Sequence, residues 1–351
     1  MPPFLTCIHR IRGMLMVLAL LLLAGCTSLP ELKTAPSHYV TASGAQARQL
    51  RTPDGLKLFS QWWLPDKDPR AVILFVHGTA MHSGFYAPWA EHLTEHGYAV
   101  LGVDLRGWGQ SEGYGRRGYV RNYDEYIADL QTAYREVHQR FPQQHVFLQG
   151  ESLGGTVVLL ASMLHAVPND GLILNAPAVK PNPGMGMLRA PGFLAGFGLW
   201  GAGVAGKVWP NFPTIPILDV STHAIFFDEK VRQRFINDPL CTHSMLPAAY
   251  LTALAEASSR LQDNLGNLQD PLLVLQGSKD ALIPEDSSEF LLSHVASTDK
   301  LLKVYKDMSH TTLLDSGHDD VWGDIISWLS TTLQYLPPAP GVVAASDSAK
   351  P

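Results

Sequence analysis

Cysteine is scarce in this chain of 351 residues, which contains only Cys7, Cys26 and Cys241. We expect Cys7 to be removed with a targeting segment and Cys26 to carry lipid, which leaves Cys241 without a partner in the chain. The sequence therefore excludes a disulfide framework. We expect Cys241 to be a buried thiol of the core.

Motifs that bind metals and nucleotides are also lacking. The fourteen histidines form no His-Glu-x-x-His motif, and the chain has no Cys-x-x-Cys pair. The glycine-rich stretch 104–113 has the wrong spacing for a Walker loop, and no Lys-Ser or Lys-Thr pair follows it. We interpret this stretch as a structural loop in which Asp104 pairs with Arg106. The sequence thus predicts no metal and no cofactor.

Positive charge is in the minority, because 26 Lys and Arg residues stand against 32 Asp and Glu residues and the net charge is −6. Loss of Arg10 and Arg12 with the targeting segment would leave 24 basic against 32 acidic residues, a net charge of −8. An acidic chain repels polyanions, so the sequence argues against nucleic acid as a partner.

The apolar run from Met14 to Ala24 is too short for a helix that spans a bilayer, which needs roughly 20 residues. With Arg10 and Arg12 before it, the run is typical of a signal peptide over residues 1–25. It ends in Leu23-Ala24-Gly25-Cys26, which resembles the bacterial lipobox, whose cysteine is lipidated and becomes the new N-terminus. Thr27 stands where an aspartate favours inner-membrane retention, so the resemblance implies the outer membrane. The alternative is a plain signal peptide with a chance cysteine.

The remaining chain divides into three parts. Residues 26–44 are rich in Ser, Thr, Ala and Pro and are expected to form a tether. Residues 45–336 suit one α/β domain with a large core. Residues 337–351, with Pro-Pro-Ala-Pro-Gly, are expected to be a disordered tail.

Apolar runs of strand length alternate with segments of helical length in the domain. This alternation predicts a mostly parallel central sheet with helices on both faces. The expected strands are 56–63, 71–77, 99–105, 145–149, 172–175, 272–276 and 301–305, and the expected helices include 88–96, 123–139, 287–296 and 319–333.

The stretch from His145 to Val158 contains Gly150-Glu151-Ser152-Leu153-Gly154 between a strand and a helix. This is the nucleophile elbow of a serine hydrolase, in which the serine takes a strained conformation and the two glycines avoid collisions. The turn places Ser152 at a helix N-terminus, where free backbone N–H groups point at developing negative charge. The context predicts that Ser152 is a nucleophile.

The oxyanion hole is expected to use two backbone N–H groups. One comes from Leu153, directly after the nucleophile, and the other from Thr79, in the loop after the strand that ends at Val76. His77 and His82 lie in the same loop, and we expect them to brace it rather than to act as the base.

The acid and the base should follow the nucleophile in that order. Asp280 comes after the strand 272–276 and is the expected acid, with Asp307 as its nearest competitor. His310 lies in a polar loop beyond the strand 301–305 and is the expected base, with His318 as the alternative.

Taken together, these motifs resemble the monoacylglycerol lipase and lysophospholipase branch of the α/β-hydrolase superfamily. The resemblance covers nearly the whole domain and implies a serine esterase that acts on lipids with one acyl chain. Ala80 and Met81 depart from it, since that family often has Gly-Glu there. It rests on five stretches: His77-Gly78 with His82-Ser83-Gly84-x-Tyr86, Gly109-x-Ser111-Glu112-Gly113, Gly150-Glu151-Ser152-Leu153-Gly154-Gly155, Asn237-Asp238-Pro239-Leu240, and Gly277-Ser278-x-Asp280 with His310.

The alternation of strands and helices fails over residues 178–246, where the resembling family carries a lid. Within it, residues 191–206 are uncharged and include Phe193, Phe197 and Trp200. We expect this stretch to shield acyl chains or touch lipid, with a plain buried helix as the alternative.

Two other functions compete with a lipid esterase. An aminopeptidase of the same superfamily would need acidic groups for the substrate amine, and residues 181–218 contain none. A non-catalytic envelope lipoprotein would not need its triad positions filled. Epoxide hydrolases and haloalkane dehalogenases are excluded because Ser152 replaces their aspartate nucleophile.

We predict that the mature protein begins at acylated Cys26 and is recovered with membranes, because each buried acyl methylene contributes about 0.8 kcal/mol. Cys26→Ser should move the protein to the soluble fraction, whereas Cys241→Ser should leave it membrane-bound. Intact-mass measurement of an unmodified mature Cys26 would contradict the prediction.

Overall fold

The computed structural model describes residues 39–180, 210–211, 213–215, 222–243 and 245–338. The predicted signal peptide 1–25, Cys26, the segment 191–206 and the tail 339–351 lie outside the described residues.

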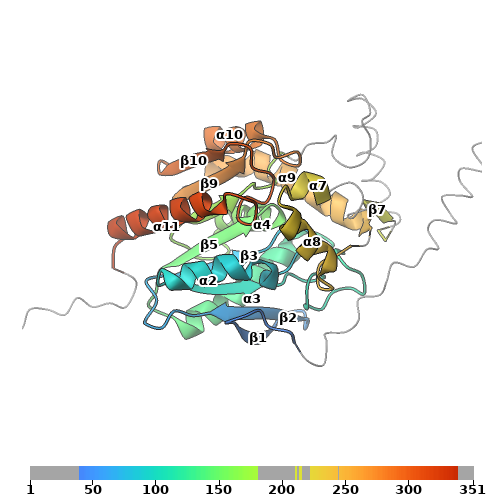
Figure 1. The fold of residues 1–351 in the computed structure, drawn as a ribbon, viewed down its shortest axis with the longest axis horizontal. Coiled ribbons are helices and arrows are strands. Elements are labelled where there is room, and N and C mark those ends of the chain that lie inside the picture. The colour runs from blue at the N-terminus through green and yellow to red at the C-terminus, as the bar shows by residue number, and fades with distance from the viewer. Residues whose placement is uncertain (1–38, 181–209, 212, 216–221, 244, 339–351) are drawn as a thin grey trace, which may run out of the picture.

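A single eight-stranded sheet forms the centre of the domain, in the order β1-β2-β4-β3-β5-β6-β9-β10 (Figure 1). β1 pairs antiparallel with β2 and β2 antiparallel with β4, and the remaining neighbours are parallel. The predicted mostly parallel sheet is therefore confirmed. The strands are β1 (Gln46–Arg51), β2 (Lys57–Trp63), β3 (Val72–Val76), β4 (Ala99–Val103), β5 (Val146–Glu151), β6 (Leu172–Asn175), β9 (Leu272–Gly277) and β10 (Lys300–Tyr305).

Helices cover both faces of this sheet, with α2 and α11 together on one face and α3, α4 and α9 packed against one another on the other (Figure 1). A short pair, β7 (Pro213–Ile215) and β8 (Leu246–Pro247), stands apart from the main sheet. The helical elements are η1 (Ser83–Tyr86), α2 (Ala87–Glu95), α3 (Tyr123–Arg140), α4 (Leu153–Met163), α7 (Thr222–Ile225), α8 (Glu229–Asn237), α9 (Ala248–Asn264), η2 (Leu265–Asn267), α10 (Glu285–His294) and α11 (His318–Tyr335).

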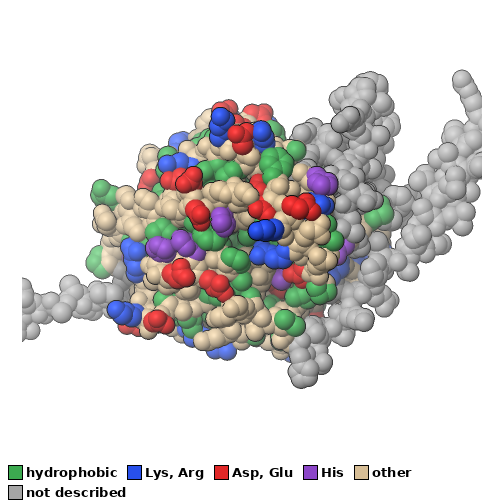
Figure 2. Space-filling view, viewed as in Figure 1, with side chains coloured by type: hydrophobic (Ala, Val, Ile, Leu, Met, Phe, Trp, Pro, Cys, Tyr) green, Lys and Arg blue, Asp and Glu red, His purple; other side chains and the backbone are tan. Residues whose placement is uncertain are grey.

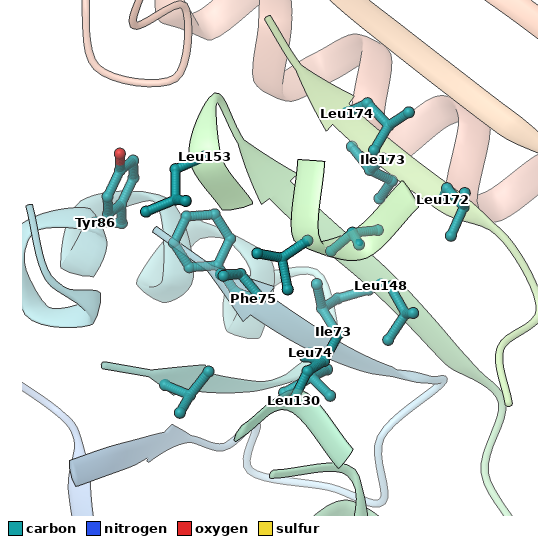
Figure 3. Packing of buried hydrophobic residues seen from close by; sticks show 14 of the residues in the cluster. Ile73, Leu74, Phe75, Tyr86, Leu130, Leu148, Leu153, Leu172, Ile173 and Leu174 are labelled. Carbon is teal, nitrogen blue, oxygen red and sulfur yellow. The ribbon is translucent and has the colours of Figure 1, made fainter. Parts of the chain in front are cut away.

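The central strands are buried on both faces, which explains their unbroken apolar sequences. Every residue of β3, β5 and β6 is buried, as is every residue of α4. Figure 3 shows the strand side chains interleaved with Leu130 of α3 and Leu153 of α4. This packing fixes the strand ends to which the candidate site residues are attached.

The seven predicted strands are all present, with ends within two residues of those expected. The prediction missed β1 and α9. In β1 only Leu50 is buried, so this edge strand lacks the apolar run that marks the others.

The predicted pairing of Asp104 with Arg106 is wrong, although the stretch is a structural loop. Arg106 reaches α3, where its Nη2 lies 2.6 Å from Oδ1 of buried Asp129, and its Nη1 lies 2.8 Å from Oδ2 of Asp54. Asp104 instead accepts hydrogen bonds from the backbone N–H of Ser83 at 2.7 Å and of Gln110 at 2.8 Å. Asp104 and Arg106 therefore each find partners in other parts of the fold rather than in each other.

Acidic and basic side chains are interspersed over the face seen in Figure 2. Among the helices described, none combines the length and the apolar character that a membrane span requires.

We predict that Asp129→Ala destabilises the protein by about 3–5 kcal/mol, because it removes the buried carboxylate that pairs with the buried Arg106 guanidinium. Urea unfolding followed by circular dichroism would measure the change. Asp124→Ala on the same helix is the control, since its pair with Arg260 is exposed and such pairs contribute about 0–1 kcal/mol. Equal losses in the two variants would contradict the prediction.

Candidate active site

Ser152 sits in the tight turn between β5 and α4, with a φ of 52° and a ψ of −110°. This positive φ is the strained conformation that the elbow motif predicts. A Cβ on Gly150 would lie 2.4 Å from the carbonyl oxygen of Gly154, and a Cβ on Gly154 would lie 2.2 Å from that of Val76. Only glycine at both positions lets α4 come this close to β5 and to the end of β3.

Asp280 and His310 come from the loops after β9 and β10. His310 Nδ1 lies 2.8 Å from Asp280 Oδ2, and the two side chains are 3% and 0% exposed. The other carboxylate oxygen of Asp280 accepts hydrogen bonds from the backbone N–H groups of Leu282 at 2.8 Å and Ile283 at 2.9 Å. The carboxylate is therefore held in one orientation, with its partners on both oxygens.

The pKa of His310 is raised. Burial acts to lower this pKa, but the charge and hydrogen bond of Asp280, together with the charge of Glu151, outweigh it. A carboxylate on Nδ1 fixes the tautomer whose free Nε2 can take a proton and supports the imidazolium that results.

The competing acid and base lie in other settings. Asp307 is on the surface, with its side chain 58% exposed and its Oδ1 2.7 Å from Lys279 Nζ. His318 begins α11, and its ring packs at a tilt against that of Trp322. The geometry thus supports Asp280 and His310 over both alternatives.

Thr79 lies in the loop after β3, and Leu153 is the first residue of α4. Within the described part of the chain, neither backbone N–H donates to another residue. Ala80, next to Thr79, has a φ of 67°, and its carbonyl accepts a hydrogen bond from Thr242 N–H at 2.8 Å. As far as the described residues extend, both N–H groups are thus available to bind an oxyanion.

His77 and His82 hold loops in place, as the sequence predicts. His77 Nδ1 donates to the carbonyl of Gly78 at 2.7 Å, and Nε2 accepts from Leu105 N–H at 3.2 Å. Burial lowers the pKa of His77 to about 4, so the ring stays neutral and can do both. His82 Nε2 lies 3.0 Å from Asp238 Oδ2.

His82, Asp238 and Cys241 are the one group in the described ranges whose ligand atoms could surround a metal ion, lying within 4.8 Å of one another. Two guanidinium groups, Arg117 and Arg234, interact electrostatically with Asp238 and Cys241. Burial raises the pKa of the Cys241 thiol. The two arginines balance the charge of Asp238, and a protonated thiol is a poor metal ligand. The cluster is therefore better explained as a buried ion-pair network than as a metal site.

The end of the predicted lid packs on the loop of His310. The carbonyl of Ile225 accepts hydrogen bonds from the hydroxyls of Ser309 at 2.7 Å and Thr311 at 3.1 Å. Asp315 bridges the same parts, accepting from Asp228 N–H at 2.8 Å and Ser309 N–H at 3.0 Å. The position of His310 therefore depends on the returning end of the insertion.

Two residues of the site were missed in the sequence. Tyr250 of α9 has its hydroxyl hydrogen-bonded to that of Thr79, and buried Glu151 accepts a hydrogen bond from Tyr86 at 2.6 Å. The position of Glu151, directly before Ser152, was the signal that could have found it.

Comparison with known proteins agrees with this geometry. The model of the family "Serine aminopeptidase, S33" matches residues 67–317. The chain is 31% identical to the monoacylglycerol lipase of Mycolicibacterium smegmatis, covering 80% of this chain and 95% of that protein. It is 30% identical to human monoglyceride lipase, covering 80% and 89%. The crystal structure of a soluble variant of monoglyceride lipase from Saccharomyces cerevisiae superposes with a TM-score of 0.72 at 20% identity, covering 85% and 99%.

We predict that Ser152→Ala, Asp280→Asn and His310→Ala each lower kcat for p-nitrophenyl butyrate at least about 10³-fold, because triad members act as a unit. Asp307→Asn is the matched control and should stay within about twofold of wild type. Circular dichroism would establish that each variant is folded. A large loss in Asp307→Asn with normal turnover in Asp280→Asn would reverse the assignment of the acid.

Proposed function

Because the chain belongs to the serine aminopeptidase S33 family, we propose that it is a serine hydrolase that cleaves the ester bond of monoacylglycerol. The observation that carries the proposal is the buried hydrogen bond of His310 to Asp280, together with the elbow that holds Ser152. The named relatives at about 30% identity supply the substrate class.

The reaction proceeds through an acyl-enzyme. Ser152 Oγ attacks the ester carbonyl as His310 Nε2 takes its proton, and Asp280 supports the imidazolium. The N–H groups of Thr79 and Leu153 stabilise the oxyanion. His310 then gives the proton to the departing glycerol oxygen, and a water molecule, activated in the same way, releases the fatty acid. General base catalysis contributes about 10²–10⁴-fold, and each oxyanion donor about 10²–10³-fold.

Residues 178–246 serve as the lid in this proposal. Phe193, Phe197 and Trp200 would cover the acyl chain, and they lie outside the described residues. At roughly 25 cal/mol per Å² of buried apolar area, covering several methylenes supplies a few kcal/mol to the transition state.

An aminopeptidase activity is the second candidate, since the matched family carries that description. Such an enzyme needs an accessible carboxylate for the substrate amine. Glu151 and Asp280 are completely buried and bonded within the protein, and residues 181–218 contain no acid. The described carboxylates nearest the elbow thus favour the ester substrate.

The proposed location is the bacterial cell envelope, with the protein anchored through acylated Cys26, most simply in the outer membrane. Support comes from the lipobox-like Leu23-Ala24-Gly25-Cys26 and from Thr27 after it. A lipid anchor would hold the hydrolase where acyl lipids are concentrated.

We predict that kcat/KM for a long-chain monoacylglycerol exceeds that for aminoacyl p-nitroanilides at least about 100-fold, because the proposed lid covers an acyl chain and the described carboxylates nearest Ser152, Glu151 and Asp280, are buried and cannot bind an amine. Steady-state kinetics across monoacylglycerols, lysophospholipids, p-nitrophenyl acetate and aminoacyl anilides would measure this. Preference for the anilides would favour the aminopeptidase.

Replacement of Phe193, Phe197 and Trp200 by serine is the matched test of the lid in the same panel. It should depress kcat/KM for the long-chain monoacylglycerol far more than for p-nitrophenyl acetate, which has no chain to cover. Equal losses on both substrates in a folded variant would mean that the segment is ordinary core.

A further inference from the structure

The carboxyl group of Glu151 lies at the end of β5, one residue before the nucleophile, and is completely buried. Its Oε1 accepts a hydrogen bond from the hydroxyl of Tyr86 at 2.6 Å. Its Oε2 has no hydrogen-bond partner among the described residues. A buried carboxyl with one unsatisfied oxygen is costly, and neither the triad nor the oxyanion hole accounts for it.

Tyr86 connects Glu151 to the loop that carries Thr79. Its hydroxyl oxygen accepts a hydrogen bond from the backbone N–H of Gly78 at 3.3 Å, next to Thr79. Figure 3 shows Tyr86 and Leu153 near the same end of the sheet as Phe75, and the rings of Phe75 and Tyr86 pack with centroids 4.7 Å apart. Tyr86 therefore connects Glu151, at the end of β5, to Gly78, the neighbour of the expected oxyanion donor Thr79.

The space between these groups is tight. A Cβ on Gly78 would lie 3.3 Å from both Glu151 Oε1 and the Tyr86 hydroxyl, and 3.0 Å from Cε of Met81. Burial and the charge of Glu151 raise the pKa of Tyr86 well above its usual range, so the phenol stays protonated and donates a hydrogen bond to Glu151. The distance between the loop at Gly78 and the carboxyl group of Glu151 is therefore fixed by Tyr86.

Glu151 also acts electrostatically on the base. Burial, together with the charge of Asp280, raises the pKa of Glu151 to about 7, although His310 and the Tyr86 hydrogen bond act to lower it. In return, the charge of Glu151 raises the pKa of His310, as Asp280 does. The titratable groups that interact with Glu151 come from three parts of the chain: Tyr86 of η1, Asp280 after β9 and His310 after β10.

We propose that Glu151 is a positioning residue of the hydrolase: it holds the oxyanion loop through Tyr86, and in its ionised form it stabilises the imidazolium form of His310. The proposal rests on the serine-hydrolase function above. When the Ser152 Oγ–carbonyl bond forms, the hydroxyl proton moves to His310 Nε2, and the new positive charge is stabilised by Asp280, 2.8 Å from Nδ1, and by the charge of Glu151. When the bond to the leaving oxygen breaks, that proton passes to the alcohol, and His310 becomes neutral again. Glu151 exchanges no proton with the substrate.

Glu151→Gln separates the two roles, because glutamine keeps an oxygen for Tyr86 but carries no charge. Without that charge the pKa of His310 falls, so the acid limb of the kcat/KM profile, which requires neutral His310, moves to lower pH by roughly 0.5–1 unit. We expect kcat to fall about 3–30-fold with KM nearly unchanged, because the charge matters most in the transition state.

Tyr86→Phe tests the other role. It removes the hydroxyl between Gly78 and Glu151, so the oxyanion loop loses its tie and kcat should fall about tenfold or more. Glu136→Gln is the matched control, since Glu136 on α3 accepts from the Trp62 indole at 3.1 Å, a bond that glutamine also makes. It should leave the pH profile and kcat unchanged.

Both p-nitrophenyl acetate hydrolysis and the rate of fluorophosphonate labelling would be followed from pH 5 to 9, because labelling requires a reactive Ser152 but no particular lipid. An unlabelled wild-type protein would overturn the proposed function itself. A wild type that is labelled, with Glu151→Gln showing the same acid limb and a kcat within twofold, would overturn only the role of Glu151. A lowered Tm in Glu151→Gln with an unchanged profile would likewise reduce Glu151 to a structural group.

Discussion

The close approach of α4 to β5 at Gly150 and to the end of β3 at Gly154 is the constraint on which the site depends. Because neither glycine has a Cβ, the helix starts directly at the strand end, and Ser152 is forced to a φ of 52°. That conformation turns the serine out of the sheet edge and leaves the N–H of Leu153 free at the start of a helix. The close contacts at the two glycines thus fix the position of both the nucleophile and the Leu153 N–H.

The loops around this turn are joined to one another by buried polar groups rather than by apolar packing alone. His77 ties the loop after β3 to Leu105, and Asp104 ties the loop after β4 back to Ser83. Ile225 and Asp315 connect the His310 loop with the end of the insertion. Since breaking a buried hydrogen bond leaves an unsatisfied partner that costs about 1–3 kcal/mol, these links make the loops one rigid unit.

Burial also sets the ionisation of the groups in this unit. His77 stays neutral because its pKa is lowered to about 4, which suits a ring that must accept one hydrogen bond and donate another. His310 is equally buried, yet its pKa is raised, because Asp280 and Glu151 supply negative charge. Histidine therefore holds a loop in place at position 77 and serves as the proposed base at position 310, and the carboxylates around each ring make the difference.

The sequence by itself determined seven of the eight strands of the central sheet and singled out Ser152, Asp280 and His310, because strand length, the elbow glycines and residue order after each strand are local signals. It did not reveal β1, whose exposed side chains carry no apolar pattern. Only the tertiary structure decided that Arg106 pairs with Asp129 rather than Asp104 and that Glu151 meets Tyr86, 65 positions away. A polar side chain takes the partner that folding brings within about 3 Å, and that choice depends on how the helices pack on the sheet rather than on spacing along the chain.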